Sequence, residues 1–392
     1  MPSDAEAGRR RRERRAARRR AVRRRRIAAV AVLAGVAVAV TFALRGLGSD
    51  GASQATATAN GEQRADAAPP AKPLPDATPI TVSATGDIVM GSLPYGLPSD
   101  GGRSFFTPVK GLLTGDVVLG NLEGTLATGG SSKCGAGSTN CYAFRTPPSY
   151  ATWLKAAGFT VMNLANNHAY DFGATGQRET VAALDRVGLL NTGRPNTQAT
   201  VTAGGQRVAI LGFAPYRWAD SLLDIPRAKR RVQAAARTAQ IVIVTMHAGA
   251  EGSDRTSVPR GPETFLGEQR GDSRAFTHAV IDAGADLVIG SGPHVLRGME
   301  IYRGRLIAYS LGNFGGYKVF SLGGPLSTSA VLQATLRPDG RLQTARIRPT
   351  RLVGAGTPAP GGSAISTIRT LSQRDFGSRA PVISADGTIT AR

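Results

Sequence analysis

The sequence predicts an α/β fold in which mixed β-sheets and helices form layers. Between about residues 79 and 299, short runs rich in Val, Ile and Leu alternate with amphipathic stretches. The apolar runs are typical of buried strands, and the amphipathic stretches are typical of helices. Further along, the pattern changes to hairpins, which are marked by turn sequences such as Arg303-Gly304. Alternating strands and helices followed by hairpins indicate a layered sandwich of mixed sheets.

The expected elements follow one another through this region. Strands are predicted at 80–84, 116–120, 160–164, 241–245 and 287–289, and hairpins at 199–214, 299–309 and 330–351. Helices are predicted at 147–157, 173–187, 227–240 and 273–283; Pro147-Pro148 suits the first turn of the earliest of them. The segment 353–392 begins rich in Gly, Pro, Ala and Ser, and we expect it to be a peripheral or loosely ordered tail.

The N-terminal 26 residues are strongly basic. They contain 13 arginines and only three acidic residues, in a chain whose net charge is +21. Nucleic-acid-binding and nuclear-targeting arms also carry such runs. The apolar stretch at 27–44 favours a membrane explanation, because as a helix it is roughly 27 Å long and spans the hydrocarbon core of a bilayer.

The charges around this stretch predict its orientation. Arginines precede it and only Arg45 follows it directly, which places residues 1–26 in the cytoplasm. A cleaved signal peptide is the alternative, but the apolar run is longer than the usual hydrophobic region of such a peptide. The polar segment 45–78 predicts a flexible linker. We therefore expect a single-pass cell-membrane protein with an extracytoplasmic domain at 79–352 and no nucleic-acid partner.

The two cysteines of the chain, Cys134 and Cys141, lie close together in a Gly- and Ser-rich loop. Two cysteines can also form half of a metal site, but here no further cysteine or nearby histidine completes one. In an exported domain they predict a small disulfide loop.

Polar side chains follow the predicted strands at the points where the strands end. They are Asp87, Glu123, Asn167 with His168, His247 and His294. Some of them have a simpler explanation on their own: an Asx-turn cap for Asp87, turn chemistry for Asn166-Asn167, and a satisfied buried imidazole for His168. Because the carboxyl ends of strands in α/β proteins converge on one crevice, their recurrence favours a shared site.

Several phrases in fixed order resemble the CapA-type family of poly-gamma-glutamate capsule-synthesis proteins, a branch of the calcineurin-like metallophosphoesterase superfamily. They are Gly86-Asp87-Ile-Val-Met-Gly91, Asn121-Leu-Glu-Gly124, Phe144-Arg145-Thr-Pro-Pro148, the Asn167-His168 stretch, and the segment from Gly284 to Phe314. The resemblance covers about residues 79–314. It implies a metallophosphoesterase-like sandwich of two facing mixed β-sheets flanked by helices.

The same resemblance implies a metal centre. One or two divalent ions (Mn, Zn or Fe) are expected on Asp87, Glu123, Asn167, His247 and His294. His168 matches the general acid, and Asp171 is expected to orient it. A metal pair activates water and neutralises charge on a phosphoryl-like group. Arg145 is expected to contact the substrate, and Asn313 is expected either to support a metal ligand or to contact the substrate.

The sequence departs from the family pattern in two places. Gly290-Ser-Gly-Pro-His294 stands where relatives commonly have Gly-His-His-Pro-His, and Val89 replaces the histidine of the Asp-x-His phrase of ordinary phosphoesterases. A single metal, a weak site or none is therefore an alternative to a metal pair. We expect Gly292 to leave a gap beside His294, filled by water or by an open coordination position.

These observations lead to one expected function and two alternatives. The first is synthesis, export or trimming of an anionic capsule or cell-surface polymer such as poly-gamma-glutamate, through a metal-dependent hydrolase-like site. Its partners are the anionic polymer or a phosphorylated cell-surface substrate, and other membrane capsule-synthesis subunits. The alternatives are a non-catalytic scaffold subunit of a membrane polymer synthase and a general metallophosphoesterase. No Walker-type loop is present to hold ATP for polymerisation.

Overall fold

The computed structural model describes residues 74, 76–135, 138 and 141–390. They belong to one compact unit, Asp66–Arg392. The predicted arginine-rich segment 1–26, the membrane helix 27–44 and most of the linker 45–78 lie outside the described residues. None of the helices within the described ranges is long and apolar enough to cross a membrane.

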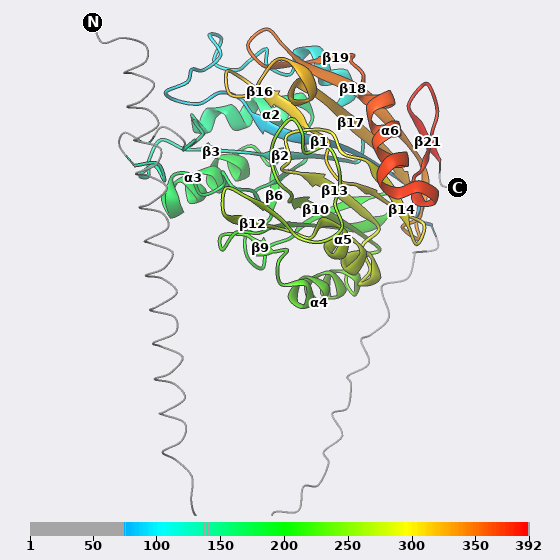
Figure 1. The fold of residues 1–392 in the computed structure, drawn as a ribbon. Coiled ribbons are helices and arrows are strands. Elements are labelled where there is room, and N and C mark those ends of the chain that lie inside the picture. The colour runs from blue at the N-terminus through cyan, green and yellow to red at the C-terminus, as the bar shows by residue number, and fades with distance from the viewer. Residues whose placement is uncertain (1–73, 75, 136–137, 139–140, 391–392) are drawn as a thin grey trace, which may run out of the picture. The chain divides into compact units, whose positions relative to one another are not determined.

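The described chain forms two large mixed sheets (Figure 1). The first has ten strands, of which eight follow the order β20-β21-β18-β17-β1-β2-β5-β6, while β16 pairs with β1 and β19 with β18. Their bounds are β1 Ile80–Val89, β2 Val117–Leu122, β5 Val161–Asn163, β6 Leu190–Thr192, β16 Asn313–Gly316, β17 Thr328–Leu336, β18 Leu342–Val353, β19 Thr357–Pro360, β20 Val382–Ile383 and β21 Thr388–Thr390. Strands β1, β2, β5 and β6 are parallel, and β17 runs antiparallel to β1.

The second sheet has seven strands in the order β14-β15-β13-β10-β8-β7, with β9 beside β8. Their bounds are β7 Ala199–Ala203, β8 Gln206–Ala214, β9 Asp220–Ser221, β10 Ile241–His247, β13 Leu287–Ser291, β14 Met299–Tyr302 and β15 Arg305–Ala308. The four central strands β8, β10, β13 and β15 are parallel, and β7 and β14 close the edges as antiparallel hairpins.

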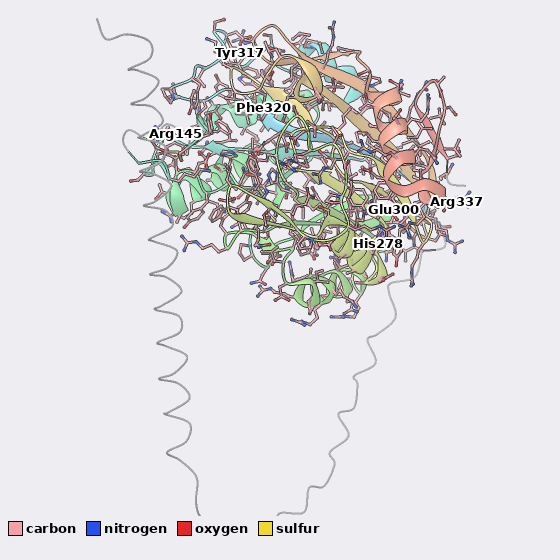
Figure 2. The ribbon with its side chains drawn as sticks, in the orientation of Figure 1. Arg145, His278, Glu300, Tyr317, Phe320 and Arg337 are labelled. Carbon is pink, nitrogen blue, oxygen red and sulfur yellow. A yellow bond between two sulfur atoms is a disulfide. The ribbon has the colours of Figure 1, made fainter. Side chains whose placement is uncertain are left out.

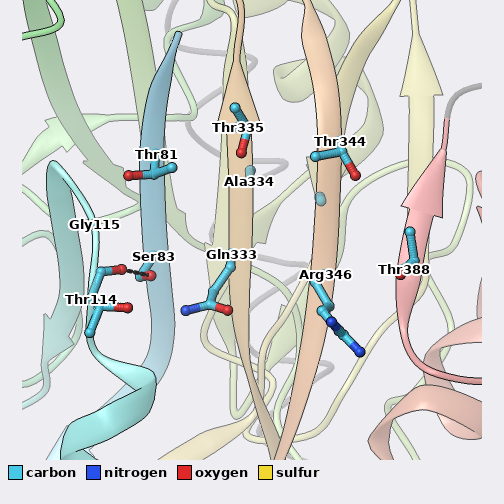
Figure 3. A pocket seen from close by; sticks show the side chains of 11 residues that line it. Thr81, Ser83, Thr114, Gly115, Gln333, Ala334, Thr335, Thr344, Arg346 and Thr388 are labelled. Carbon is cyan, nitrogen blue, oxygen red and sulfur yellow. Dashed lines mark hydrogen bonds between the residues drawn. The ribbon is translucent and has the colours of Figure 1, made fainter.

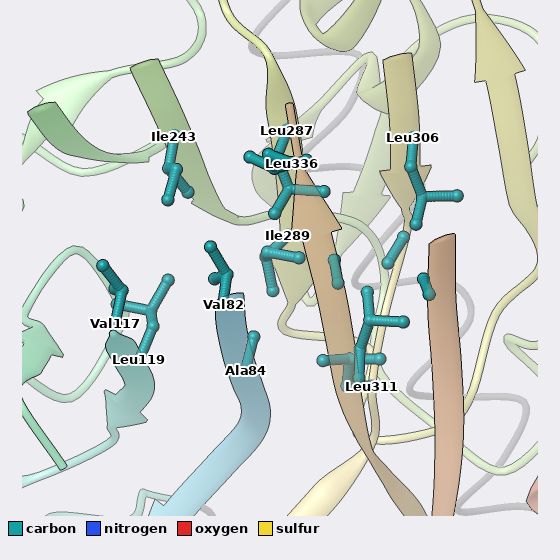
Figure 4. Packing of buried hydrophobic residues seen from close by; sticks show 14 of the residues in the cluster. Val82, Ala84, Val117, Leu119, Ile243, Leu287, Ile289, Leu306, Leu311 and Leu336 are labelled. Carbon is teal, nitrogen blue, oxygen red and sulfur yellow. The ribbon is translucent and has the colours of Figure 1, made fainter. Parts of the chain in front are cut away.

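The main hydrophobic core lies between the two sheets. Val82 and Leu119 of the first sheet belong to the same buried cluster as Ile243 and Leu287 of the second (Figure 4). The outer faces form separate clusters: α2 (Ala151–Ala157) and α3 (Gly173–Arg186) contribute to one, α4 (Ile225–Ala236) and α5 (Ser273–Asp282) to the other. This arrangement confirms the predicted mixed α/β sandwich.

The prediction of a loosely ordered tail was wrong for residues 353–390. Strands β19 and β21 extend the first sheet, and helix α6 (Ala364–Phe376) packs against β14 and β18. Ile368 is fully buried in the core between the sheets. Ala364, Ile368 and Leu371 recur at helical spacing, and the Gly- and Pro-rich composition before them masked that period.

Most of the short elements were not predicted. The parallel pair β3 (Thr125–Leu126) and β4 (Arg145–Thr146), and the hairpin of β11 (Glu263–Phe265) with β12 (Glu268–Gly271), are too short to show a hydrophobic period. Short 3₁₀ helices lie at Thr107–Leu112, Pro148–Tyr150, Gly324–Ser327 and Gly377–Arg379. The predicted disulfide is confirmed, with Cys134 and Cys141 joined just before β4.

Candidate metal centre

The position of Asp87 is fixed by a change of partner along β1. Residues Ile80–Ala84 pair antiparallel with β17, whereas Asp87 begins the parallel pairing with β16. At the change, a Cβ on Gly86 would lie 1.8 Å from the carbonyl oxygen of Gly312, so only glycine fits there. The Asp87 amide donates to that same oxygen at 3.0 Å. The Gly-Asp pair of the sequence is therefore needed to bring the Asp87 carboxylate to the strand end.

Four of the predicted ligands converge from both sheets. Asp87 Oδ1 lies 3.8 Å from His247 Nδ1, and Asp87 Oδ2 lies 3.1 Å from His294 Nδ1. Glu123 Oε1 lies 3.7 Å from Nε2 of His247 and equally far from Nε2 of His294. Asp87, Glu123 and His247 are fully buried, and His294 is 9% exposed. Glu123 therefore lies between the two imidazoles, where a carboxylate can bridge two ions.

Several donor atoms in this cluster have no hydrogen-bond partner among the described residues. They are Asp87 Oδ2, both carboxylate oxygens of Glu123, and His247 Nε2. Ligand atoms of Asp87, Glu123 and His247 all lie within 4.8 Å of one another. Buried polar atoms are costly without a partner, and a divalent cation would satisfy all of these. The residues therefore fit a metal ion, and carboxylate oxygens mixed with imidazole nitrogens suit the expected Mn, Zn or Fe.

A row of carboxamides fixes the Asp87 carboxylate, and the sequence analysis missed it. Asn121 Nδ2 donates to Asp87 Oδ1 at 2.7 Å. Asn121 Oδ1 in turn accepts from Asn163 Nδ2 at 2.8 Å and from Asn166 Nδ2 at 3.1 Å. Asp87, Asn121 and Asn163 are register partners on β1, β2 and β5. The sequence signal for this row was an asparagine at the ends of neighbouring predicted strands. Residues at the ends of paired parallel strands lie side by side, so these asparagines come into contact.

The segment from Asn167 to Asp171 places the Asn167 carboxamide and the His168 imidazole beside the cluster. Asn167 Nδ2 donates to Glu251 Oε1 at 3.2 Å, while its Oδ1 is buried without a partner among the described atoms. His168 Nδ1 lies 2.7 Å from Asp171 Oδ2, and the His168 ring packs at 4.2 Å from Phe144. Asp171 also accepts from the amide of Phe144. The ring orientation of His168 is thus fixed through Nδ1.

Asp171 has one further partner that the sequence did not reveal. Lys133 Nζ lies 2.6 Å from Asp171 Oδ1 and donates to the carbonyl oxygen of Asn167 at 3.2 Å. Because Lys133 directly precedes Cys134, the disulfide loop is connected to the support of His168.

Burial and neighbouring charges shift the pKa values of the clustered residues in different directions. Burial, and then the neighbouring charge of Asp87, raises the pKa of Glu123 well above its ordinary value. Burial lowers the pKa of His247 well below its ordinary value, so this ring is neutral. Burial also acts to lower the pKa of His294, but Glu123 and Asp87 outweigh it and raise the pKa to about 10. A proton on His294 therefore balances charge that a cation would balance in its place.

The pKa values of Asp87 and His168 are both lowered, but for different reasons. Burial acts to raise the pKa of Asp87, but His294, whose Nδ1 lies 3.1 Å from Asp87 Oδ2, outweighs it and lowers that pKa. Burial lowers the pKa of His168, and Asp171 offsets part of this effect. His168 is therefore neutral at pH 7, with Nδ1–H directed at Asp171.

The two residues expected to contact substrate have different settings. Asn313 is fully buried, its Oδ1 lies 2.9 Å from His294 Nδ1, and its Nδ2 donates to the carbonyl oxygen of Leu326. Asn313 therefore supports His294, which is one of the two roles expected of it, and its contact with a substrate stays a prediction. The guanidinium of Arg145 packs 4.2 Å from the Phe172 ring and lines a cavity of about 380 Å³ beside the disulfide. Contact between Arg145 and a substrate stays a prediction.

The expected gap at Gly292 is absent. A Cβ at this position would lie 2.9 Å from both the amide nitrogen and the carbonyl oxygen of Ala248, and 3.2 Å from the His247 ring. The φ angle of Gly292 is +114°, which disfavours a side chain. The prediction was wrong because the backbone of Ala248 fills the space.

A second cavity, of about 430 Å³, lies on the first sheet (Figure 3). Side chains of β1, β17, β18 and β21 line it, among them Ser83, Gln333 and Arg346. Arg346 is the charged residue of this lining, and its guanidinium pairs with Asp386 at 3.1 Å. The cavity contains none of the predicted site residues and offers no comparable set of metal ligands.

The fold and the cluster together define a protein with a candidate metal centre at the meeting point of two mixed sheets. Residues 81–317 match the family described as bacterial capsule synthesis protein PGA_cap. The chain belongs to this family, which confirms the resemblance noted from its motifs.

Individual relatives agree with the family match. The capsule biosynthesis protein CapA of Bacillus anthracis is 33% identical over 245 residues, covering 56% of this chain and 54% of that protein. The PGA biosynthesis protein CapA of Bacillus subtilis is 33% identical over 230 residues, covering 53% and 54%. A probable polyglutamine synthesis accessory protein of Mycobacterium tuberculosis is 34% identical over 200 residues, covering 44% and 49%. The chain thus spans about half the length of the curated relatives it matches.

Solved structures give weaker likenesses. The NAD nucleotidase of Haemophilus influenzae aligns with a TM-score of 0.38 at 13% identity, covering 77% of this chain and 57% of that one. A 5′-nucleotidase precursor from Thermus thermophilus aligns with a TM-score of 0.39 at 14% identity, covering 76% and 59%. The fold of this chain is therefore defined by its own two mixed sheets.

Cation binding should release protons. When Mn²⁺ is added to metal-free protein at pH 7.5, at least one proton should leave per protein, because His294 is protonated below its pKa of about 10 and must lose that proton to bind an ion. The apparent affinity should rise with pH up to that value. Calorimetry in two buffers of different ionisation enthalpy measures the number released. His294→Gln should release one proton fewer, and identical heats in both buffers would contradict the expectation.

Proposed function

We propose that this protein acts in the synthesis, export or trimming of an anionic cell-surface polymer such as poly-gamma-glutamate, through a metal-dependent hydrolase-like site. The observation that carries the proposal is the buried, unpartnered set of donor atoms on Asp87, Glu123 and His247. Membership of a capsule-synthesis family, and relatives named for capsule and PGA biosynthesis, support the polymer class. A phosphorylated cell-surface molecule is the other substrate class that suits such a site.

Asp87, Glu123, Asn167, His247 and His294 would hold the ion or ions. A bound divalent ion supplies an activated water and stabilises negative charge on the group under attack. The side-chain amide of Asn121 holds the Asp87 carboxylate in place before any ion arrives. The side-chain amide of Asn313 does the same for the His294 ring.

His168 is the residue that would move a proton. Its Nδ1–H is held by Asp171, so its Nε2 is the atom that meets the substrate. The lowered pKa makes the neutral ring the resting form, which accepts a proton through Nε2. An anionic substrate favours the protonated ring, and that form donates a proton to a leaving group.

A specific observation favours a second candidate, a non-catalytic scaffold subunit of a membrane polymer synthase. The backbone of Ala248 fills the space next to Gly292, so an additional imidazole has no place there. His294, the most exposed of the four clustered ligands, is only 9% exposed, and the Phe320 ring lies 5.0 Å from it. A site this enclosed suits an ion held for stability as well as one used for turnover.

We also propose that residues 27–44 form a retained membrane anchor, with residues 1–26 in the cytoplasm and the folded domain outside it. The arginines before the apolar stretch and its length support this orientation. The Cys134–Cys141 disulfide supports an extracytoplasmic location, because disulfides persist in oxidising compartments. Other membrane subunits of capsule synthesis are then within reach as partners.

Two histidine substitutions should separate catalysis from metal binding. His168→Ala should keep the metal and lose turnover by roughly 10²- to 10⁴-fold, which is the range for a general acid or base. His247→Ala should lose metal, because its ring faces both Asp87 and Glu123. Metal content and hydrolysis of poly-gamma-glutamate and of a chromogenic phosphodiester measure both effects.

His278→Ala is the matched control, since that ring pairs with Glu300 on the outer side of the second sheet (Figure 2). Equal metal binding by the His168→Ala and His247→Ala proteins would show that His247 has another role. A fully metal-loaded wild type that hydrolyses neither substrate would favour the scaffold.

The membrane topology has its own test. Protease added to intact spheroplasts should digest the domain that follows residue 78, because the proposed anchor places it outside. A cytoplasmic protein serves as the control for leakage. Survival of the domain until detergent opens the membrane would contradict the orientation.

A further inference from the structure

Glu251 is a carboxylate beside the metal cluster for which the sequence indicated no role. Its Oε2 lies 3.7 Å from His294 Nε2, and its Oε1 accepts from Asn167 Nδ2 at 3.2 Å. Its side chain is 19% exposed, more than that of any of the four clustered ligands. Glu251 therefore lies on the outer side of His294, between that imidazole and Asn167.

Arg270 on β12 holds Glu251 in this position. Arg270 Nη1 lies 2.9 Å from Glu251 Oε1, and Arg270 Nε donates to the carbonyl oxygen of Gly249 at 2.9 Å. The Arg270 side chain is 1% exposed, so its guanidinium is fixed by the protein interior. Because Asn167 and Arg270 both bind Oε1, Oε2 is the oxygen left to face His294.

We propose that Glu251 Oε2 is an additional donor to the cation site, on the side of His294. This inference rests on the proposed function, because it requires that the cluster bind metal. Glu251 Oε2 and Glu123 Oε1 each lie 3.7 Å from His294 Nε2. Two ligand atoms that each lie about 2.1 Å from a tetrahedral ion are about 3.4 Å apart. The two 3.7 Å distances would therefore shorten only slightly if an ion were bound between these atoms.

The buried atoms around Glu251 support a ligand between these groups. Both oxygens of Glu123 and Oδ1 of Asn167 have no hydrogen-bond partner among the described residues. A simple ion pair of Glu251 with Arg270 would leave all three atoms unsatisfied. An ion held by His294, Glu251 and Asn167 would share Glu123 with an ion held by Asp87 and His247.

Glu251→Gln tests this assignment, because glutamine keeps the shape and an acceptor for Arg270 but removes the charge. The full-length chain in mild detergent should bind two Mn²⁺ in a calorimetric titration, with magnetic coupling between the ions in the electron paramagnetic resonance spectrum. The Glu251→Gln protein should bind one of them at least tenfold more weakly and lose the coupling at matched Mn²⁺ concentration.

Glu268→Gln is the matched control. The Glu268 carboxylate lies 3.9 Å from Arg270 Nη1 but is 59% exposed, and it should leave both ions in place. Unchanged Mn²⁺ affinity and stoichiometry in Glu251→Gln would overturn the role of Glu251 while leaving the proposed function standing. An equal loss in Glu268→Gln would also overturn it, because net charge would then explain the effect. A wild type that binds no Mn²⁺ would end both proposals.

Discussion

The burial of Asp87 and Glu123 in one place is the constraint on which the rest of the site depends. Two carboxylates taken out of water are costly unless charges or hydrogen bonds compensate them. Asp87 has Asn121 and His294 as compensation, whereas both oxygens of Glu123 lack a partner among the described residues. Glu123 is therefore the carboxylate that a cation would compensate at the point where the two sheets meet. The packing of the core between the sheets offsets this cost.

The fold explains why these groups are held firmly. Asp87 comes from the first sheet and His247 from the second, and the apolar side chains below them belong to one cluster. The ligand geometry is consequently set by the packing of one sheet on the other. A substitution deep in that core would move ligands that it does not touch, which is a general property of densely packed interiors.

The strand ends could be predicted from the sequence, but the contacts across strands could not. Asp87, Glu123, His247 and His294 each follow an apolar run, and that pattern needs no knowledge of pairing. The role of Asn121 depends on the register of three parallel strands, and the role of Glu251 on an arginine from a four-residue strand. The tail was misjudged because composition hid the helical period of α6. Gly292 was misjudged because a missing side chain does not reveal that neighbouring backbone fills its space.

The central claim is that the buried cluster is a cation site, and anomalous diffraction tests it most directly. Crystals of the protein soaked in Mn²⁺ would be measured at the manganese absorption edge. The account predicts an anomalous peak about 2.0 to 2.3 Å from both a Glu123 oxygen and His247 Nε2. A map from fully soaked crystals with no peak among Asp87, Glu123 and His247 would contradict it.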